Sequence, residues 1–188
     1  DVLQQSIFSD VSQNDENYVA VNFLKNNDVV RGYPDGTFKS ENSVSRVEAL
    51  KFIYEGLNKE VKPTAYLEFK DTDSKAWYAR YIASAQREGI AKGYEGNVFK
   101  PAANVTRAEF IKMLVEASGM DGKNYVGSGK PYSDVDMKAW YANYISLAKD
   151  KNLIDSSSNL VKPNELMSRG EVAQILYRII VMKASGKI

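Results

Sequence analysis

Thr106-Arg107-Ala108-Glu109 decides the fold of this chain, because close copies of it recur at Ser45-Arg46-Val47-Glu48 and Ser168-Arg169-Gly170-Glu171. The copies are about 61 and then about 62 residues apart. A Ser or Thr followed three residues later by Glu is the capping box of a helix N-terminus. Each copy leads directly into an apolar run of helical period. We therefore predict that three helices begin at these stretches.

Capping does not explain the arginine in each copy, which is Arg46, Arg107 or Arg169. A cation in the first turn faces the positive end of the helix dipole and is mildly unfavourable there. Three arginines at this position indicate a use other than helix initiation, and a bound anion would supply one. The alternative is a salt bridge to a nearby Asp that ties neighbouring repeats together. The two roles can coexist in one residue.

The repeats divide the 188 residues into three units of about 60, each small for an independent core, so we expect the units to pack on one another. A hydrophobic content of 44% with 26% charged residues is typical of a soluble globular protein. The net charge of +1 gives no general attraction to nucleic acid or membrane, so any electrostatic recognition must be local. No window resembles a membrane span or a signal peptide, and we expect a soluble mature chain or one cut from a longer protein.

Thiol chemistry, cysteine metal sites and histidine acid–base chemistry are excluded, because the chain has no Cys and no His. The absence of Cys also fits an exported bacterial protein. Asp71-Thr72-Asp73 begins like a calcium loop, but an EF-hand would need Gly and Glu where Ala76 and Ile82 stand. No carboxylate pair is fixed at a glycosidase geometry. We predict no metal site, no cofactor and no enzymatic activity.

Each repeat opens with an aromatic residue followed two positions later by Asp, as in Phe8 and Asp10. The other two copies of this aspartate are Asp71 and Asp134. An Asp ahead of a helix usually forms a turn or an N-cap. The alternative is an acceptor that faces a ligand groove.

A first helix is predicted in each repeat, over residues 14–27, 75–88 and 138–151, with a narrow, Ala-rich apolar face. Trp77 and Trp140 stand at matching places in the second and third repeats, and Glu16 takes that place in the first. A Trp at a helix start either packs or forms a platform for a ligand, and the sequence favours neither. We expect the following Tyr78 and Tyr141 to lie in the core.

A glycine-containing loop follows, with Gly32-Tyr33 in the first repeat and Gly93-Tyr94 in the second. We expect a tight turn in which glycine supplies positive φ and the trailing Phe38 or Phe99 anchors the loop. The third repeat has Asp155–Leu160 there and has lost both glycines and the tyrosine.

The second helices have apolar faces that none of them can bury alone, so we expect the three to meet around a shared axis. The predicted core positions are Leu50, Ile53, Leu57, Phe110, Ile111, Leu114, Val172, Ile175, Leu176 and Ile179. Two loose segments, 58–66 and 119–130, separate the repeats.

With these four features in order, the chain resembles three tandem S-layer homology repeats, from about Phe8 to about Met182. The resemblance implies an all-α fold, mainly helical with long loops, as a pseudo-threefold assembly around a central three-helix bundle. The implied repeats are 8–66, 67–130 and 131–188, integrated into one unit.

Members of this family anchor surface proteins to secondary cell wall polymers, often ones with pyruvylated N-acetylmannosamine, or to modified peptidoglycan. The resemblance thus implies a non-catalytic module on the bacterial cell surface, monomeric by itself and attached to a larger protein. Its partner would be an anionic wall polysaccharide, not nucleic acid or membrane. A structural or protein-binding module of the envelope is the alternative.

The resemblance also implies that the ligand lies in grooves between repeats, with the signature Arg on the anionic ketal. The implied ligand-binding residues are Arg46, Arg107, Arg169, Trp77, Trp140, Asp10, Asp71, Asp134, Gly32, Tyr33, Gly93 and Tyr94. Because the third repeat lacks the Gly-Tyr loop, the sequence ranks the grooves of Arg46 and Arg107 above that of Arg169.

Overall fold

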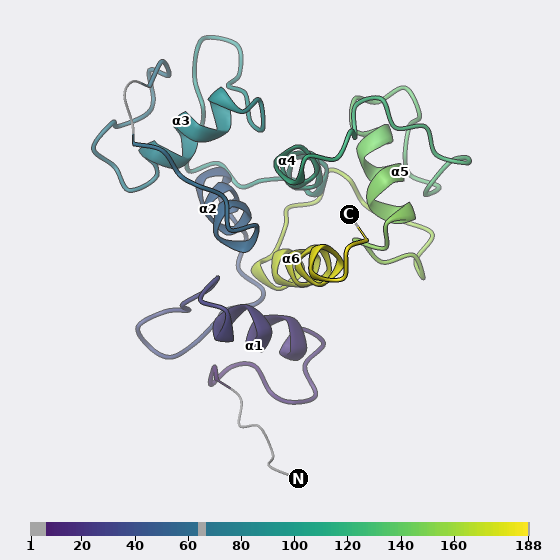
Figure 1. The fold of residues 1–188 in the computed structure, drawn as a ribbon, viewed down its shortest axis with the longest axis horizontal. Helices are drawn as coiled ribbons and strands as arrows, with labels where there is room; N and C mark the ends of the chain where they lie inside the picture. Colours follow the sequence, from purple (N-terminus) through teal and green to yellow (C-terminus); the bar gives the residue numbers. More distant parts are fainter. Residues whose placement is uncertain (1–6, 64–66, 188) are drawn as a thin grey trace.

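The structure is a computed structural model that describes residues 7–63 and 67–187. Within these ranges the chain forms six α-helices and no strand, which confirms the all-α class (Figure 1). The predicted repeat ends at Tyr66 and Ile188, and most of the lead-in before Phe8, lie outside the described residues. The helices are α1 (Tyr18–Asn26), α2 (Arg46–Gly56), α3 (Ala79–Arg87), α4 (Arg107–Ser118), α5 (Ala142–Asp150) and α6 (Arg169–Ala184).

The three capping boxes form as predicted and start α2, α4 and α6, each at its signature Arg. At α2, the Glu48 amide donates to Ser45 Oγ at 3.3 Å and the Ser45 amide donates to the Glu48 carboxylate at 2.8 Å. All ten predicted core positions on these helices are buried. The three helices lie at the centre of the molecule, and α2 packs on both α4 and α6 (Figure 1).

The outer helices α1, α3 and α5 begin about four residues later than predicted. Before α3, the chain forms successive turns in which the Ala76 amide donates to the Asp73 carbonyl and the Ala79 amide to the Ala76 carbonyl. The Asp73 side chain also accepts from the Lys75 amide at 2.8 Å. Such local side-chain bonds compete with the helix, so Trp77 lies in the turn that precedes α3.

Each outer helix packs on the central helix of the preceding repeat. Helix α3 packs on α2, α5 on α4, and α1 on α6, so the first repeat closes against the last (Figure 1). The repeat in the sequence is therefore not the packing unit of the structure.

A closed ring of three backbone hydrogen bonds joins the loops that precede the capping boxes. The Val44 amide donates to the Met167 carbonyl at 3.0 Å, Met167 to Val105 at 3.0 Å, and Val105 to Val44 at 2.9 Å. All three side chains are fully buried. The ring satisfies backbone groups that burial would otherwise leave unpaired. It also fixes the cyclic order of the repeats, although the pseudo-threefold assembly itself stays a prediction.

Candidate functional site

Each signature arginine leaves its own repeat and contacts the loop of the next one. Arg46 Nε donates to the Phe99 carbonyl at 3.0 Å and its Nη2 to the Lys92 carbonyl at 3.1 Å. Its Nη1 lies 3.5 Å from the carboxylate of Glu109, the capping-box glutamate of α4. The residue is only 5% exposed. Arg46 therefore ties the first repeat to the second.

Aromatic rings enclose the guanidinium groups of Arg46 and Arg169. The guanidinium carbon of Arg46 lies 4.6 Å from the ring centroid of Tyr94 and 4.7 Å from that of Phe99. Arg169 has the same arrangement with the first repeat, at 4.9 Å from Tyr33 and 4.7 Å from Phe38. Cation–π contacts of this kind hold the charge in place at low exposure.

Arg169 differs from Arg46 in having unused donors. Its Nε donates to the Phe38 carbonyl at 2.9 Å, and no residue of the described ranges accepts from either Nη group. The residue is 8% exposed, and burial lowers the pKa of its guanidinium. Glu48, the capping-box glutamate nearby, acts on it only through a longer-range attraction. The Nη groups of Arg169 thus keep donors that no described residue uses.

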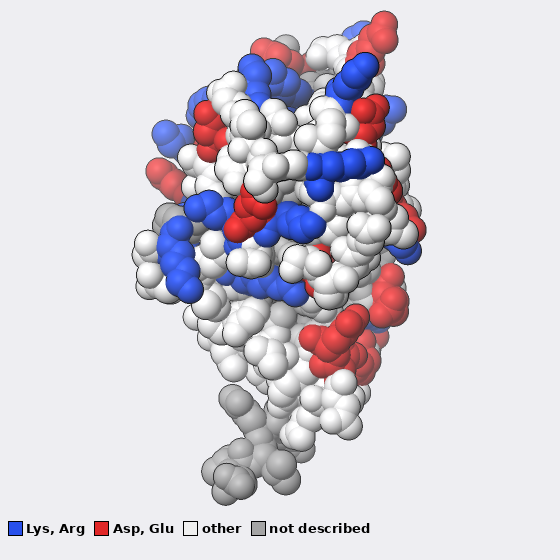
Figure 2. Space-filling model, turned by 90° about the vertical axis from the view of Figure 1, so that its right-hand side faces the viewer, with Lys and Arg blue, Asp and Glu red and all other residues white. Residues whose placement is uncertain are grey.

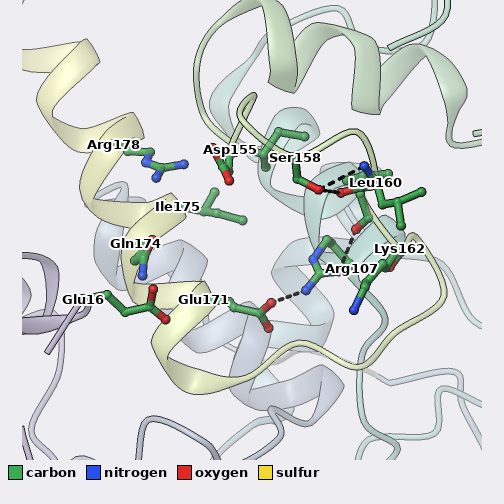
Figure 3. A pocket seen from close by; sticks show the side chains of 12 residues that line it. Glu16, Arg107, Asp155, Ser158, Leu160, Lys162, Glu171, Gln174, Ile175 and Arg178 are labelled. Carbon is green, nitrogen blue, oxygen red and sulfur yellow. Dashed lines mark hydrogen bonds and ion pairs between the residues drawn. The ribbon is translucent and has the colours of Figure 1, made fainter. Parts of the chain in front are cut away.

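Arg107 makes three polar contacts, as many as Arg46. Its Nη1 donates to the carbonyls of Val161 at 2.7 Å and Lys162 at 3.1 Å, and its Nη2 forms an ion pair with Glu171 (Figure 3). No aromatic ring of the described residues stacks on it. The predicted alternative of an inter-repeat salt bridge is thus realised at Arg46 and Arg107, but the partner is a capping-box Glu rather than an Asp.

These contacts define three grooves, each built from all three repeats. Groove 1 contains Arg46, Tyr94, Glu109, Lys92, Lys112 and Trp140. Groove 2 contains Arg107, Asp155, Glu171, Lys162, Gln174, Arg178 and Glu16 (Figure 3). Groove 3 contains Arg169, Gly32, Arg31, Asp28, Glu48, Lys51, Glu55, Arg80 and Trp77. The arginine comes from one repeat, the loop and central helix from the next, and the Trp or Glu16 from the third.

Both tryptophans lie on the surface. Each lies beside a groove whose arginine and loop come from the other two repeats. Trp77 is 53% exposed and Trp140 is 55% exposed. Lys51 Nζ lies 5.6 Å from the centroid of the Trp77 ring. Their exposure argues against a purely structural role, because a packed Trp would be mostly buried. Tyr78 and Tyr141, expected in the core, are half-buried against it.

The three repeat-opening aspartates clamp the loop of their own repeat. Asp71 accepts from the amides of Phe99 and Lys100, each at 2.7 Å. Asp10 and Asp134 make the same pair of bonds to their loops. Lys100 has a φ of 57°, a left-handed conformation that this clamp supports. None of the three aspartates caps a helix or lines one of the three grooves, although a ligand role for them stays a prediction.

The Gly-Tyr loops need glycine for two different reasons. A Cβ at Gly32 would lie 2.2 Å from Phe8 Cε1, and one at Gly93 would lie 2.2 Å from Phe69 Cε1. Gly32 also has a φ of 73°. The expectation of positive φ is wrong for Gly93, where the close approach of the Phe69 ring and of the Val98 carbonyl oxygen requires glycine.

The ranking of the grooves rested on a premise that the structure contradicts. It assumed that each arginine is served by the loop of its own repeat. Arg169 instead contacts the intact Gly-Tyr loop of the first repeat, and the altered loop of the third repeat serves Arg107. The demotion of Arg169 therefore has no structural basis, and groove 2 is the divergent one.

Sequence reasoning missed several residues that line the grooves. Lys51, Lys112 and Gln174 each stand five residues after a signature Arg, at matching positions of the central helices. Arg31 and Lys92 precede the loop glycines. Their fixed spacing was a usable signal, but single exposed cations do not stand out in a sequence with 25 of them.

The charges divide unequally among the grooves although the chain is nearly neutral. Groove 1 has three cations and one carboxylate, groove 3 has four cations and three carboxylates, and groove 2 has three of each. On the face in Figure 2, Lys and Arg gather across the middle while acidic residues collect toward one lower edge. The charges are therefore unevenly distributed although the net charge is only +1.

Metal binding and membrane insertion have no visible basis in the described ranges. No group of three or more His, Cys, Asp or Glu there could hold a metal ion. Within the same residues, no helix combines the length and the apolar character needed to cross a bilayer.

Three segments of the chain, 7–50, 68–111 and 131–173, match the S-layer homology domain. The chain is 27% identical over 157 residues to the S-layer protein EA1 of Bacillus anthracis, covering 84% of the chain and 18% of that protein. It is 30% identical over 166 residues to the Surface-layer 125 kDa protein of Lysinibacillus sphaericus, covering 86% and 14%.

A third relative is the Cellulosome-anchoring protein of Acetivibrio thermocellus, at 28% identity over 125 residues, covering 64% of the chain and 27% of that protein. The chain spans less than a third of each of these relatives.

Proposed function

Because the chain belongs to the S-layer homology domain family, we propose that it is a non-catalytic module that anchors a larger surface protein to a bacterial cell wall. Relatives named as S-layer and cellulosome-anchoring proteins support an extracellular place at the cell surface. The ligand is a wall polysaccharide with an anionic, pyruvylated N-acetylmannosamine-type sugar. The carboxylate of the ketal binds the signature arginine, and the face of a tryptophan covers the apolar side of the sugar ring.

One observation carries the proposal: Arg169 is 8% exposed, lines groove 3, and has two Nη groups with no acceptor in the described residues. A buried cation without a close anion is costly. A carboxylate could bind both Nη groups as a bidentate, charge-assisted pair. The groove also holds Trp77, which supplies an aromatic face.

The grooves are proposed to be unequal, with grooves 1 and 3 binding and groove 2 serving chiefly to hold the repeats together. Groove 2 has Glu16 in place of Trp, and its Arg107 is neutralised by Glu171. An anionic sugar there would face three carboxylates. At groove 2, the alternative function of a structural module has support, because every contact of Arg107 described above joins the second repeat to the third.

The test is calorimetric titration of the pyruvylated monosaccharide into the intact chain and into Arg46→Lys, Arg107→Lys and Arg169→Lys variants. Lysine keeps the charge but cannot bind a carboxylate bidentately. We expect Arg169→Lys and Arg46→Lys to weaken binding by about tenfold or more, and Arg107→Lys to change it by less than about twofold.

Thermal unfolding of each variant serves as the control for lost folding. The same sugar without pyruvate should not bind measurably. Equal losses from all three variants would refute the unequal grooves. Unchanged retention of the chain on walls stripped of pyruvate would instead favour a protein-binding module of the envelope.

A further inference from the structure

Groove 1 holds two lysines beside Arg46 that the proposed function does not use. Lys92 is exposed on the loop and Lys112 is partly buried on α4, and both line the groove together with Glu109. Lys112 Nζ lies 5.9 Å from the centroid of the Tyr144 ring. Burial lowers the pKa of Lys112, and the nearby charges of Lys92 and Arg46 add to this, while the carboxylate of Glu116 opposes it. Three cations are thus held close enough to repel one another.

The same two cations recur in groove 3 and are both missing from groove 2. The backbone fixes the correspondence, because the amides of Val29, Ile90 and Leu153 donate to equivalent carbonyls of α1, α3 and α5. Two residues further on stand Arg31, Lys92 and Asp155.

A matching position on the central helices also has a cation in grooves 1 and 3 but not in groove 2. The residues five places after the signature arginines are Lys51, Lys112 and Gln174. Groove 2 has therefore exchanged one of these cations for an acid and the other for a neutral amide, in the same groove where Trp is replaced by Glu16. The joint loss indicates that the two cations act together with the aromatic face.

The charges of groove 1 exceed what a single carboxylate can neutralise. Among the residues that line groove 1, three cations against Glu109 leave an excess of two positive charges, although Glu116 outside the lining also attracts Lys112. A sugar with one ketal carboxylate would leave one of the lining cations without an acidic group in the groove. Groove 3 has an excess of only one, because Asp28, Glu48 and Glu55 also line it. Groove 1 is therefore the place where a ligand with two acidic groups fits best.

We propose that groove 1 is a subsite for a glycan segment with two acidic groups, one bound by Arg46 and the second by Lys92 and Lys112, with Trp140 against the sugar between them. The inference rests on the proposed function and adds the charge of the ligand. The second group is a phosphate or a second carboxylate on the same or the adjoining sugar.

The test compares three probes on the intact chain by calorimetry at low salt. They are the methyl glycoside of pyruvylated N-acetylmannosamine, the same compound with a phosphate, and the same compound joined to a uronic acid. The first has a single carboxylate. We expect one of the two doubly acidic probes to bind about tenfold more tightly than the first, the size of one charge-assisted contact. Which of them gains identifies the second group.

Lys112→Gln copies the residue that groove 2 has at this position, and Lys130→Gln removes the same charge from an exposed loop outside the grooves. Lys112→Gln should reduce the advantage of the doubly acidic probe over the singly acidic probe from about tenfold to less than about twofold. Lys130→Gln should preserve the gain. Addition of salt should reduce it, because such contacts are screened.

The two proposals fail in different ways. If the singly acidic probe binds and neither doubly acidic probe gains, the second subsite is refuted and the anchoring function stands. Equal loss for all probes in Lys112→Gln would also refute it, since it would make Lys112 a general structural residue. If no probe binds, both proposals are wrong.

Discussion

At the scale of single residues, the signature arginines make structural contacts and, in the proposed function, also bind the ligand. In both Arg46 and Arg169, Nε donates to a loop carbonyl of the next repeat, and the guanidinium lies close to two aromatic rings. These contacts hold the guanidinium in one orientation before a ligand arrives. Preorganised donors bind an anion without the cost of ordering a long side chain. The dipole that disfavours a cation at a helix start becomes an asset when an anion lies between them.

Asp71 provides a prediction at this scale. Asp71→Asn leaves one acceptor oxygen where two amides, those of Phe99 and Lys100, now donate. We expect the free energy of unfolding to fall by about 1–3 kcal/mol, as for a lost hydrogen bond to a charged group. Urea denaturation measures it, with Glu95→Gln as an exposed control. Unchanged stability with weakened sugar binding would instead make Asp71 a ligand residue.

At the scale of elements, the capping boxes of the central helices are the strongest local determinants. At α4, the Glu109 amide donates to Thr106 Oγ1 at 3.3 Å and the Thr106 amide donates to Glu109 at 2.9 Å. Glu109 also faces groove 1, where it accepts from Tyr94 at 2.7 Å. One residue thus starts the helix and helps to shape the groove.

Thr106→Ala should lower the free energy of unfolding by about 1 kcal/mol, the usual cost of a lost N-cap. Thr106→Ser is the matched control, because the other two repeats have Ser at this position. It should retain nearly all of the stability. A Thr106→Ala variant as stable as the parent chain would show that tertiary packing alone positions the start of α4.

The contacts between outer and central helices include tyrosine–glutamate hydrogen bonds, which predict a pH dependence. Tyr81 donates to Glu55 at 2.6 Å and Tyr54 donates to Glu88 at 3.0 Å. Burial, together with these carboxylates, raises the pKa of both hydroxyls above the value of 10.0 for a free tyrosine. Tyr94 behaves alike, since burial and Glu109 raise its pKa to about 12.

A raised pKa in the folded state means that the unfolded chain loses its proton first. The stabilisation linked to these raised pKa values is fully present below pH 10, the pKa of a free tyrosine, and decreases as the pH rises above that value. We expect constant urea midpoints from about pH 8 to about pH 10 and a steep fall above. Tyr54→Phe with Tyr81→Phe should flatten that fall. A profile unchanged by these substitutions would contradict the assignment.

At the scale of the whole molecule, the repeats close into a ring, and each outer helix packs on a central helix of another repeat. Helix α1 packs on α6, and the backbone ring of Val44, Val105 and Met167 requires all three repeats. Each groove also takes residues from all three. The third repeat is therefore part of the site on Arg169 and part of the packing of α1.

A chain that lacks residues 169–188 tests this closure. This truncation removes α6, so α1 loses the helix on which it packs and groove 3 loses Arg169. We expect general loss of helical circular dichroism and of the cooperative thermal transition, rather than the loss of one lobe. A deletion confined to residues 185–188, beyond α6, should leave both unchanged. Retention of a cooperative transition by the shorter chain would show that the rest of the chain folds without α6.

The sequence predicted those features that depend on neighbours a few residues apart. The capping boxes at Ser45, Thr106 and Ser168, the apolar faces of the central helices and the aromatic–glycine loops all have local patterns. The starts of the outer helices were misplaced because competing side-chain bonds, such as that of Asp73 with the Lys75 amide, form turns where the sequence predicts the first helical turn. The aspartate clamp was also missed, since Asp10 and Phe38 are 28 residues apart.

The sequence by itself determined the family, the number of repeats and the starts of the three central helices, and it predicted which arginines could bind an anion. Only the tertiary structure decided which residues share a groove. Arg169 contacts Phe38 across 131 residues, a partnership set by the closure of the ring. A local sequence pattern cannot encode this contact, because nothing in the sequence around an arginine specifies which of the three loops it will contact. The closed packing of α1 on α6 selects one cyclic pairing, and it places Glu16, Gln174 and the altered loop of the third repeat together in groove 2.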